Sequence, residues 1–124
     1  MNAGIKHIEF WVLDLKKSLE FYSQLFPLIG WQQFDETSFS YGEAKIYFIQ
    51  QDVTFNKNVG PRHICFLADS KETIDKVSQF LKNINAFIIR GPLESKYKTR
   101  SSYTIDFKDP DGYILEVATK SEKL

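Results

Sequence analysis

Two histidines and one glutamate are the residues of this 124-residue chain whose types and places could build a metal site. His7 and His63 are its only histidines, and each lies near the start of a β-rich segment. Glu116 lies inside the last such segment, where a carboxylate is disfavoured unless it is paired or coordinated. Two imidazoles and one carboxylate, with further positions open, suit Fe²⁺ or Mn²⁺, and Zn²⁺ or Ni²⁺ accept the same donors. Such a metal could hold two oxygens of a small molecule. The alternative is that both histidines bond to backbone groups and Glu116 pairs with a cation.

Further side chains could take part in chemistry at such a centre. Glu9 lies two residues after His7, and it is a candidate general base, a residue that orients the histidine, or a solvated surface carboxylate. Glu116 and Glu9 are therefore the candidate catalytic residues. Cys65 stands in the same relation to His63, but it is equally a small buried apolar residue. The residues that could contact a substrate are Trp11, Phe48, Gln50, Arg100 and Tyr103.

The two histidines belong to a repeated pattern. The segment 6–12 resembles the segment 62–68, and the histidines are 56 positions apart. A Ser-Gln pair follows each segment, and the two pairs are 55 positions apart. A unit repeated at half the chain length predicts a fold with a pseudo-two-fold axis, which brings both imidazoles to related places.

Hydrophobic periodicity predicts the same order of elements in each half, namely strand, helix and three strands. The fold class is therefore α+β, with two tandem βαβββ modules inside one domain, residues 1–124. Module one spans 5–51, a polar linker spans 52–60 and module two spans 61–119. In module one, strands are expected at 5–12, 30–34, 37–41 and 44–50, with a helix from Leu15 that ends before Pro27. In module two, strands are expected at 62–68, 87–89, 102–107 and 113–119, with a helix capped by Ser70 and a loop at 91–98.

Composition excludes several classes of function. Sixteen basic and sixteen acidic residues give a net charge near zero, so the basic surface that nucleic acids require is absent. No apolar run is long enough to span a bilayer, and a single cysteine excludes an internal disulfide. We expect a cytoplasmic protein. An aromatic content of 15% suits a core, and also a cleft for a small organic molecule.

Strand alternation predicts one evenly apolar face and one mixed face in each module. His7, Glu9 and Trp11 share the mixed face of the first strand, and Ile114 and Glu116 share that of the last. We place Phe48 on the same kind of face. A half-apolar concave surface is typical of a ligand cleft, whose curved sheets would form a metal-binding cup. The surface could equally pack on the other module or on a second subunit, and we expect a homodimer.

With these residues identified, the chain resembles the vicinal oxygen chelate superfamily, which includes glyoxalase I, extradiol dioxygenases, fosfomycin-resistance enzymes and bleomycin-resistance proteins. The resemblance covers residues 5–119. It rests on His7-Ile8-Glu9-Phe10, on Arg62-His63-Ile64, and on Asp109-Pro110-Asp111-Gly112 with Glu116 four residues beyond.

The resemblance implies that His7, His63 and Glu116 hold a divalent metal. Glyoxalase I usually adds a glutamate from the last strand of its first module, and our alignment places Phe48 there, with Gln50 two residues along. The implied function is a glyoxalase-like enzyme of lyase, isomerase, thiol- or water-adding or dioxygenase type, acting on a small molecule chelated through two oxygens. The alternatives are a metal-free protein that sequesters a drug, as bleomycin-resistance members do, and a module with a vestigial site.

Overall fold

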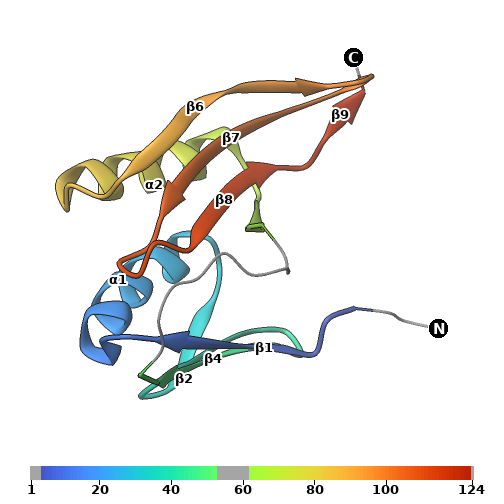
Figure 1. The fold of residues 1–124 in the computed structure, drawn as a ribbon. Helices are drawn as coiled ribbons and strands as arrows, with labels where there is room; N and C mark the ends of the chain where they lie inside the picture. Colours follow the sequence, from blue (N-terminus) through green and yellow to red (C-terminus); the bar gives the residue numbers. More distant parts are fainter. Residues whose placement is uncertain (1–3, 53–61, 124) are drawn as a thin grey trace. The chain divides into compact units, whose positions relative to one another are not determined.

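Module one is a four-stranded mixed sheet with one helix. A computed structural model describes residues 4–52 and 62–123 of the chain, which divides into the units 1–57 and 58–124. The sheet order is β1-β4-β3-β2, with β1 parallel to β4 and the other neighbours antiparallel. The elements are β1 (His7–Val12), α1 (Leu15–Leu28), β2 (Gln32–Asp35), β3 (Ser38–Tyr41) and β4 (Ala44–Gln50) (Figure 1).

Module two repeats this order. Its sheet runs β5-β8-β7-β6, again with the first pair parallel and the others antiparallel, and a short extra strand pairs with β7. The prediction of an α+β fold with two βαβββ modules is therefore confirmed. The elements are β5 (Ile64–Ala68), α2 (Lys71–Asn83), β6 (Ile88–Tyr97), β7 (Arg100–Lys108), β8 (Ile114–Thr119) and β9 (Glu122–Lys123).

Both helices begin where the sequence predicts, and each has a side-chain cap. The Asp14 carboxylate accepts a hydrogen bond from the backbone N–H of Lys17 at 3.2 Å, and the Ser70 hydroxyl accepts one from Thr73 at 3.2 Å. Helix α1, however, continues through Pro27 to Leu28. A proline in the last turn forfeits one intrahelical hydrogen bond, so the helix ends soon after it and not before it. No helix of the described residues has the length and apolar character needed to cross a membrane.

Each helix covers the apolar face of its own sheet. In module one, Phe10, Tyr22, Phe26, Phe39 and Phe48 form a buried cluster of rings whose neighbouring centroids lie 4.4–6.3 Å apart. In module two, the core is largely aliphatic and comes from α2 and all strands of the main sheet except β6. Its fully buried members are Ile74, Val77, Leu81, Ile105, Phe107, Leu115 and Val117. In both modules the face opposite the helix carries polar side chains, among them Glu9 in module one and Glu116 in module two.

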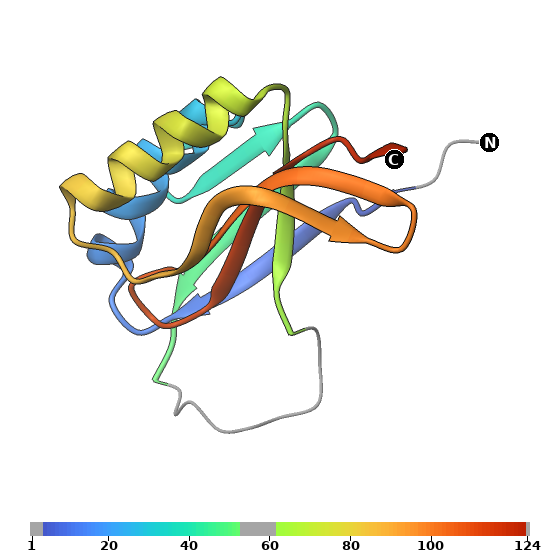
Figure 2. The same cartoon turned by 90° about the horizontal axis from the view of Figure 1, so that it is seen from above.

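The segment predicted as a loop at 91–98 is mostly strand. Figure 2 shows β6 and β7 as a long curved hairpin, with Leu93 paired to Thr104 and Tyr97 to Arg100. The polar composition that suggested a loop is that of an edge strand, which is paired on one side only. Gly91 causes a break in the register: its φ is +94°, and an added Cβ would lie 2.5 Å from the Thr104 carbonyl oxygen. The predicted linker, 52–60, lies outside the described residues apart from Asp52.

Candidate metal centre

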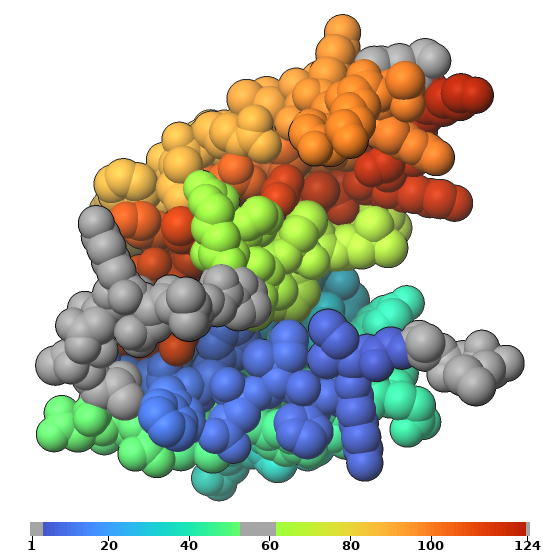
Figure 3. All heavy atoms as spheres, turned by 45° about the vertical axis from the view of Figure 1, so that its right-hand side comes forward, coloured from blue at the N-terminus to red at the C-terminus, as the bar shows by residue number. Residues whose placement is uncertain are grey.

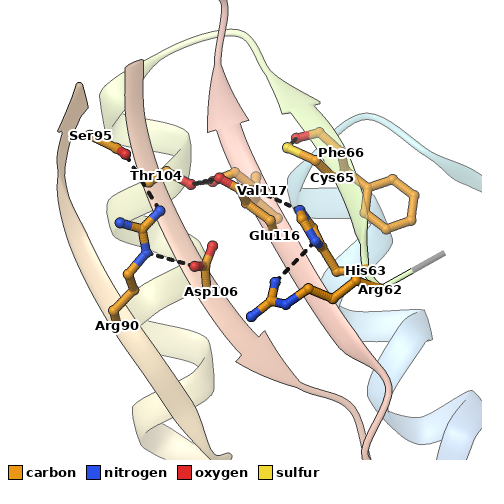
Figure 4. Close-up of polar contacts among 10 residues, drawn as sticks. All are labelled: Arg62, His63, Cys65, Phe66, Arg90, Ser95, Thr104, Asp106, Glu116 and Val117. Atoms are coloured by element: carbon orange, nitrogen blue, oxygen red, sulfur yellow. Dashed lines mark hydrogen bonds and ion pairs between the residues drawn. The ribbon is translucent and has the colours of Figure 1, made fainter. Parts of the chain in front are cut away.

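Module two brings two of the three predicted metal ligands together. Glu116 lies in the middle of β8, and His63 directly precedes β5, which begins at Ile64 and not at Arg62 as predicted. Since β5 and β8 are parallel neighbours, the two side chains reach the same face, and His63 Nε2 lies 3.1 Å from Glu116 Oε1 (Figure 4). An imidazole nitrogen and a carboxylate oxygen thus converge at one place.

The neighbouring arginine determines which nitrogen of His63 carries the proton. Arg62 Nη1 lies 3.2 Å from His63 Nδ1. A guanidinium only donates hydrogen bonds, so Nδ1 accepts and the proton of the neutral ring sits on Nε2, which donates to Glu116. A metal bound through Nε2 would require the proton on Nδ1, where it would face Arg62. Metal binding therefore requires that Arg62 release this contact.

A buried threonine fixes the other oxygen of the carboxylate. Thr104 is fully buried in β7, and its hydroxyl donates to Glu116 Oε2 at 2.6 Å. Both oxygens of Glu116 are therefore engaged by neighbouring side chains, and the carboxylate is held in one orientation. A ligand carboxylate that is hydrogen-bonded in this way is preorganised for a cation.

Glu116 is part of a row of side chains that crosses the sheet. The register pairs Cys65 with Glu116, Glu116 with Asp106, and Asp106 with Arg90, so one residue from each of four strands lies on the same face. Arg90 Nε donates to Asp106 Oδ2 at 2.7 Å, and this contact raises the pKa of Arg90. The other oxygen, Asp106 Oδ1, is buried without a hydrogen-bond partner among the described residues. Two adjacent carboxylates repel each other, so this row favours a cation.

Sequence reasoning missed Thr104, Asp106 and Arg90 as members of this site. The alternation of β7 could have indicated Thr104 and Asp106, because both lie on the face of the strand that carries Glu116. No sequence pattern indicated Arg90, because it lies before the break at Gly91 and its cross-strand partner follows only from the observed register.

Cys65 is a weak nucleophile even though it lies at the surface. Partial desolvation raises the pKa of its thiol to about 12, and the Glu116 carboxylate adds to this effect by disfavouring a second negative charge. In metal-free protein near pH 8 we expect iodoacetamide to alkylate Cys65 about a thousandfold more slowly than in urea-unfolded chain, since the thiolate fraction falls tenfold per pKa unit. Equal rates, measured by mass spectrometry, would contradict this prediction.

Module one presents the third predicted ligand on the expected face. His7, Glu9 and Trp11 alternate with the buried residues of β1, and Figure 3 shows side chains of this segment, in blue, at the surface. Glu9 Oε2 accepts a hydrogen bond from Trp11 Nε1 at 2.7 Å. The His7 ring makes an edge contact with Tyr47, with centroids 5.6 Å apart.

The structure corrects the faces predicted for Phe48 and Gln50. Phe48 pairs with Phe10 and is buried under α1, because residues opposite each other on neighbouring strands share a face. Gln50 pairs with Val12 on that same helix-covered face, and its side-chain oxygen accepts the backbone N–H of Leu15 at 2.9 Å. Neither residue therefore lies on the mixed face.

The position that corresponds to Glu116 is instead held by Tyr47. Ile8 pairs with Ile46 in module one, and its counterpart Ile64 pairs with Leu115 in module two. The residue after Ile46 is Tyr47, and the residue after Leu115 is Glu116, so these two positions correspond. Tyr47 is half-buried and lies on the face of His7 and Glu9. The predicted asymmetry between the modules therefore holds, with an aromatic phenol in the place where we expected Phe48.

The two residues predicted at the last hairpin lie away from Glu116. The Tyr103 hydroxyl donates to Asp75 of α2 at 2.9 Å, which places this side chain on the helix-covered side of the sheet. Arg100 is exposed at the start of β7, where it pairs with Tyr97 and Lys123. Tyr103 is therefore a structural contact of α2, and Arg100 lies at the far end of the hairpin.

The donor types present in module two fit a divalent metal. A neutral imidazole and an oriented carboxylate are ligands that Zn²⁺, Fe²⁺ and Mn²⁺ accept. Among residues 4–52 and 62–123, no three His, Cys, Asp or Glu side chains gather into a set that could hold a metal ion. A complete site would therefore need a donor beyond His63 and Glu116.

Comparison with known proteins shows which family and which solved structures this chain resembles. The model of the Glyoxalase/Bleomycin resistance protein/Dioxygenase superfamily matches residues 4–117. Virulence protein STM3117 of Salmonella typhimurium is 27% identical over 121 residues, which are 92% of this chain and 82% of that protein. A glyoxalase-like protein from Bacillus halodurans has a solved structure with a TM-score of 0.80 and 26% identity, covering 94% of this chain and 95% of that one. The fosfomycin resistance protein FosX of Listeria monocytogenes shares the fold, with a TM-score of 0.71 and 21% identity over 97% and 95% of the chains.

Proposed function

Because the chain belongs to the Glyoxalase/Bleomycin resistance protein/Dioxygenase superfamily, we propose that it is a divalent-metal-dependent enzyme whose substrate is a small molecule with two chelating oxygens. The observation that carries this proposal is the 3.1 Å approach of His63 Nε2 to Glu116 Oε1, with Thr104 orienting the carboxylate. Superfamily members typically bind divalent metals, and the donor types here suit them.

In this proposal His7, His63 and Glu116 hold the metal. A divalent metal, when bound, supplies Lewis acidity toward two substrate oxygens. Glu9 is the general base, because its Oε2 is engaged by Trp11 at 2.7 Å while its other oxygen makes no hydrogen bond among the described residues. Trp11 orients this carboxylate and offers an apolar surface to the substrate. The phenol of Tyr47 stands in the place of a fourth carboxylate ligand, which leaves more of the metal's coordination open.

Metal analysis of protein purified without chelator tests the proposal. We expect about one equivalent of metal per chain in the wild type, and its loss in both His7→Ala and His63→Ala, because each imidazole supplies a ligand. Glu9→Gln is the matched control: it alters a carboxylate two residues from His7 and should keep the metal. Circular dichroism establishes that every variant is folded.

Two outcomes would contradict the proposal. A folded, metal-free wild type that gains no metal on incubation with Zn²⁺, Mn²⁺, Fe²⁺ or Ni²⁺ would favour the metal-free sequestering protein. Full metal retention in both histidine variants would show that the ligands lie elsewhere.

The same proposal includes a small-molecule substrate as partner and a homodimer. Light scattering on the purified chain tests the dimer.

A further inference from the structure

Arg90 lies at the edge of the polar row that contains Glu116. Building on the proposed function, we propose that Arg90, held in place by Asp106, binds an anionic group of the substrate. The substrate is therefore a small anionic molecule, whose charged group is a carboxylate, phosphate or phosphonate.

The geometry leaves the guanidinium available for a ligand. Asp106 Oδ2 accepts from Arg90 Nε at 2.7 Å, which fixes the plane of the group (Figure 4). Arg90 Nη2 makes only a long 3.5 Å contact with the Ser95 hydroxyl, and Nη1 has no partner among the described residues. The side chain is 45% exposed, so solvent reaches it. Planar N–H pairs of arginine are the usual partners of carboxylate and phosphate oxygens.

The charges of the row favour an anionic ligand once a metal is present. Two carboxylates, Glu116 and Asp106, are balanced by two guanidiniums, Arg62 and Arg90. A divalent cation would leave an excess of two positive charges on this face, which an anion reduces. Such an anion would meet Arg90 across the sheet from Glu116, because the register aligns Arg90, Asp106 and Glu116.

Asp106 positions Arg90 and does not itself meet the ligand. Its Oδ2 accepts from Arg90 Nε at 2.7 Å, whereas its Oδ1 is buried out of reach of solvent and has no hydrogen-bond partner in the described part of the chain. The charged contact at Oδ2 holds the guanidinium in one orientation, and the ligand binds to the remaining N–H groups of Arg90.

Calorimetric titration of metal-loaded protein with glycolate and with inorganic phosphate tests this assignment. We expect Arg90→Gln to weaken the binding of both probes at least tenfold, and Arg90→Lys to restore part of the loss, because it returns the charge but not the planar fork. Arg100→Gln is the matched control, an exposed arginine on the adjacent strand whose loss should leave both affinities unchanged. Asp106→Asn should weaken both probes as well, because an amide holds the guanidinium less firmly than the carboxylate does.

Metal content is measured on each sample so that two failures can be told apart. Equal affinities in the wild type and Arg90→Gln, at equal metal content, would overturn the role of Arg90 and leave the metal proposal intact. A wild type that takes up no metal would overturn the proposed function instead. In that case the same titrations on metal-free protein decide the role of Arg90: a tenfold loss in Arg90→Gln supports it, and unchanged or absent binding overturns it.

Discussion

Replacing Phe48 by glutamate should unfold module one, whereas the same replacement at the adjacent Tyr47 should be tolerated. Phe48 is 2% exposed, and its ring contacts those of Phe10, Tyr22 and Phe39. Loss of a buried phenylalanine side chain costs about 3–5 kcal/mol by itself. A carboxylate left without a partner in that space adds a desolvation penalty, so we expect a total loss above about 5 kcal/mol in the free energy of unfolding.

Tyr47 provides the contrast because it lies on the other face of the same strand. Its ring makes edge contacts with His7 and Phe34 on the half-exposed side. A glutamate there keeps its carboxylate near solvent, and we expect a loss of less than about 2 kcal/mol, the scale of partly buried aromatic contacts. Urea denaturation followed by circular dichroism measures both variants, with Phe48→Leu as the conservative control. Similar losses for the two glutamate variants would show that the register of β4 is wrong.

This pair of residues also shows why the sequence placed one strand face incorrectly. Alternation is clear in β1, where His7, Glu9 and Trp11 separate the buried residues, so its faces could be predicted. In β4, the run Ile46-Tyr47-Phe48-Ile49 is apolar or aromatic at every position, and its periodicity does not identify a buried face. Only the pairing of β4 with β1 shows that Phe48 is buried and that Tyr47 corresponds to Glu116.

The partners of Glu116 were hidden for a related reason. The glutamate itself was predictable, because a carboxylate inside an otherwise apolar strand needs a compensating group. His63 was found through the repeat. Asp106 depends on the pairing of β7 with β8. Arg90 depends on the register of a hairpin that shifts at Gly91, and strand propensity does not report such a break. The sequence repeat therefore predicted the fold and the places of the two histidines. The other residues of the row could be identified only from the cross-strand pairing in the structure.

Replacing Glu116 by glutamine should lower metal affinity at least about a hundredfold without weakening the metal-free fold. The change removes a charged ligand from the proposed centre, and loss of even an outer hydrogen-bond partner of a ligand costs about 10–100-fold. In metal-free protein the same change relieves repulsion between Glu116 and Asp106, so the free energy of unfolding should stay equal or rise. The stabilisation that metal confers, about 2.7 kcal/mol when its concentration is 100 times the wild-type Kd, should then fall to about 0.4 kcal/mol or less.

Thermal unfolding with and without metal measures both effects, and Thr104→Val separates the ligand from the residue that orients it. Valine keeps the buried shape but removes the 2.6 Å hydrogen bond to Glu116 Oε2, so we expect a loss of about 10–100-fold in metal affinity. Ser101→Ala is the control, because its hydroxyl serves a different carboxylate, that of Glu94, on the same hairpin. Metal stabilisation that survives in Glu116→Gln would show that this carboxylate is held by His63 and Thr104 for structural reasons alone. If Glu116 is an oriented metal ligand, metal stabilisation should fall in Thr104→Val and fall further in Glu116→Gln.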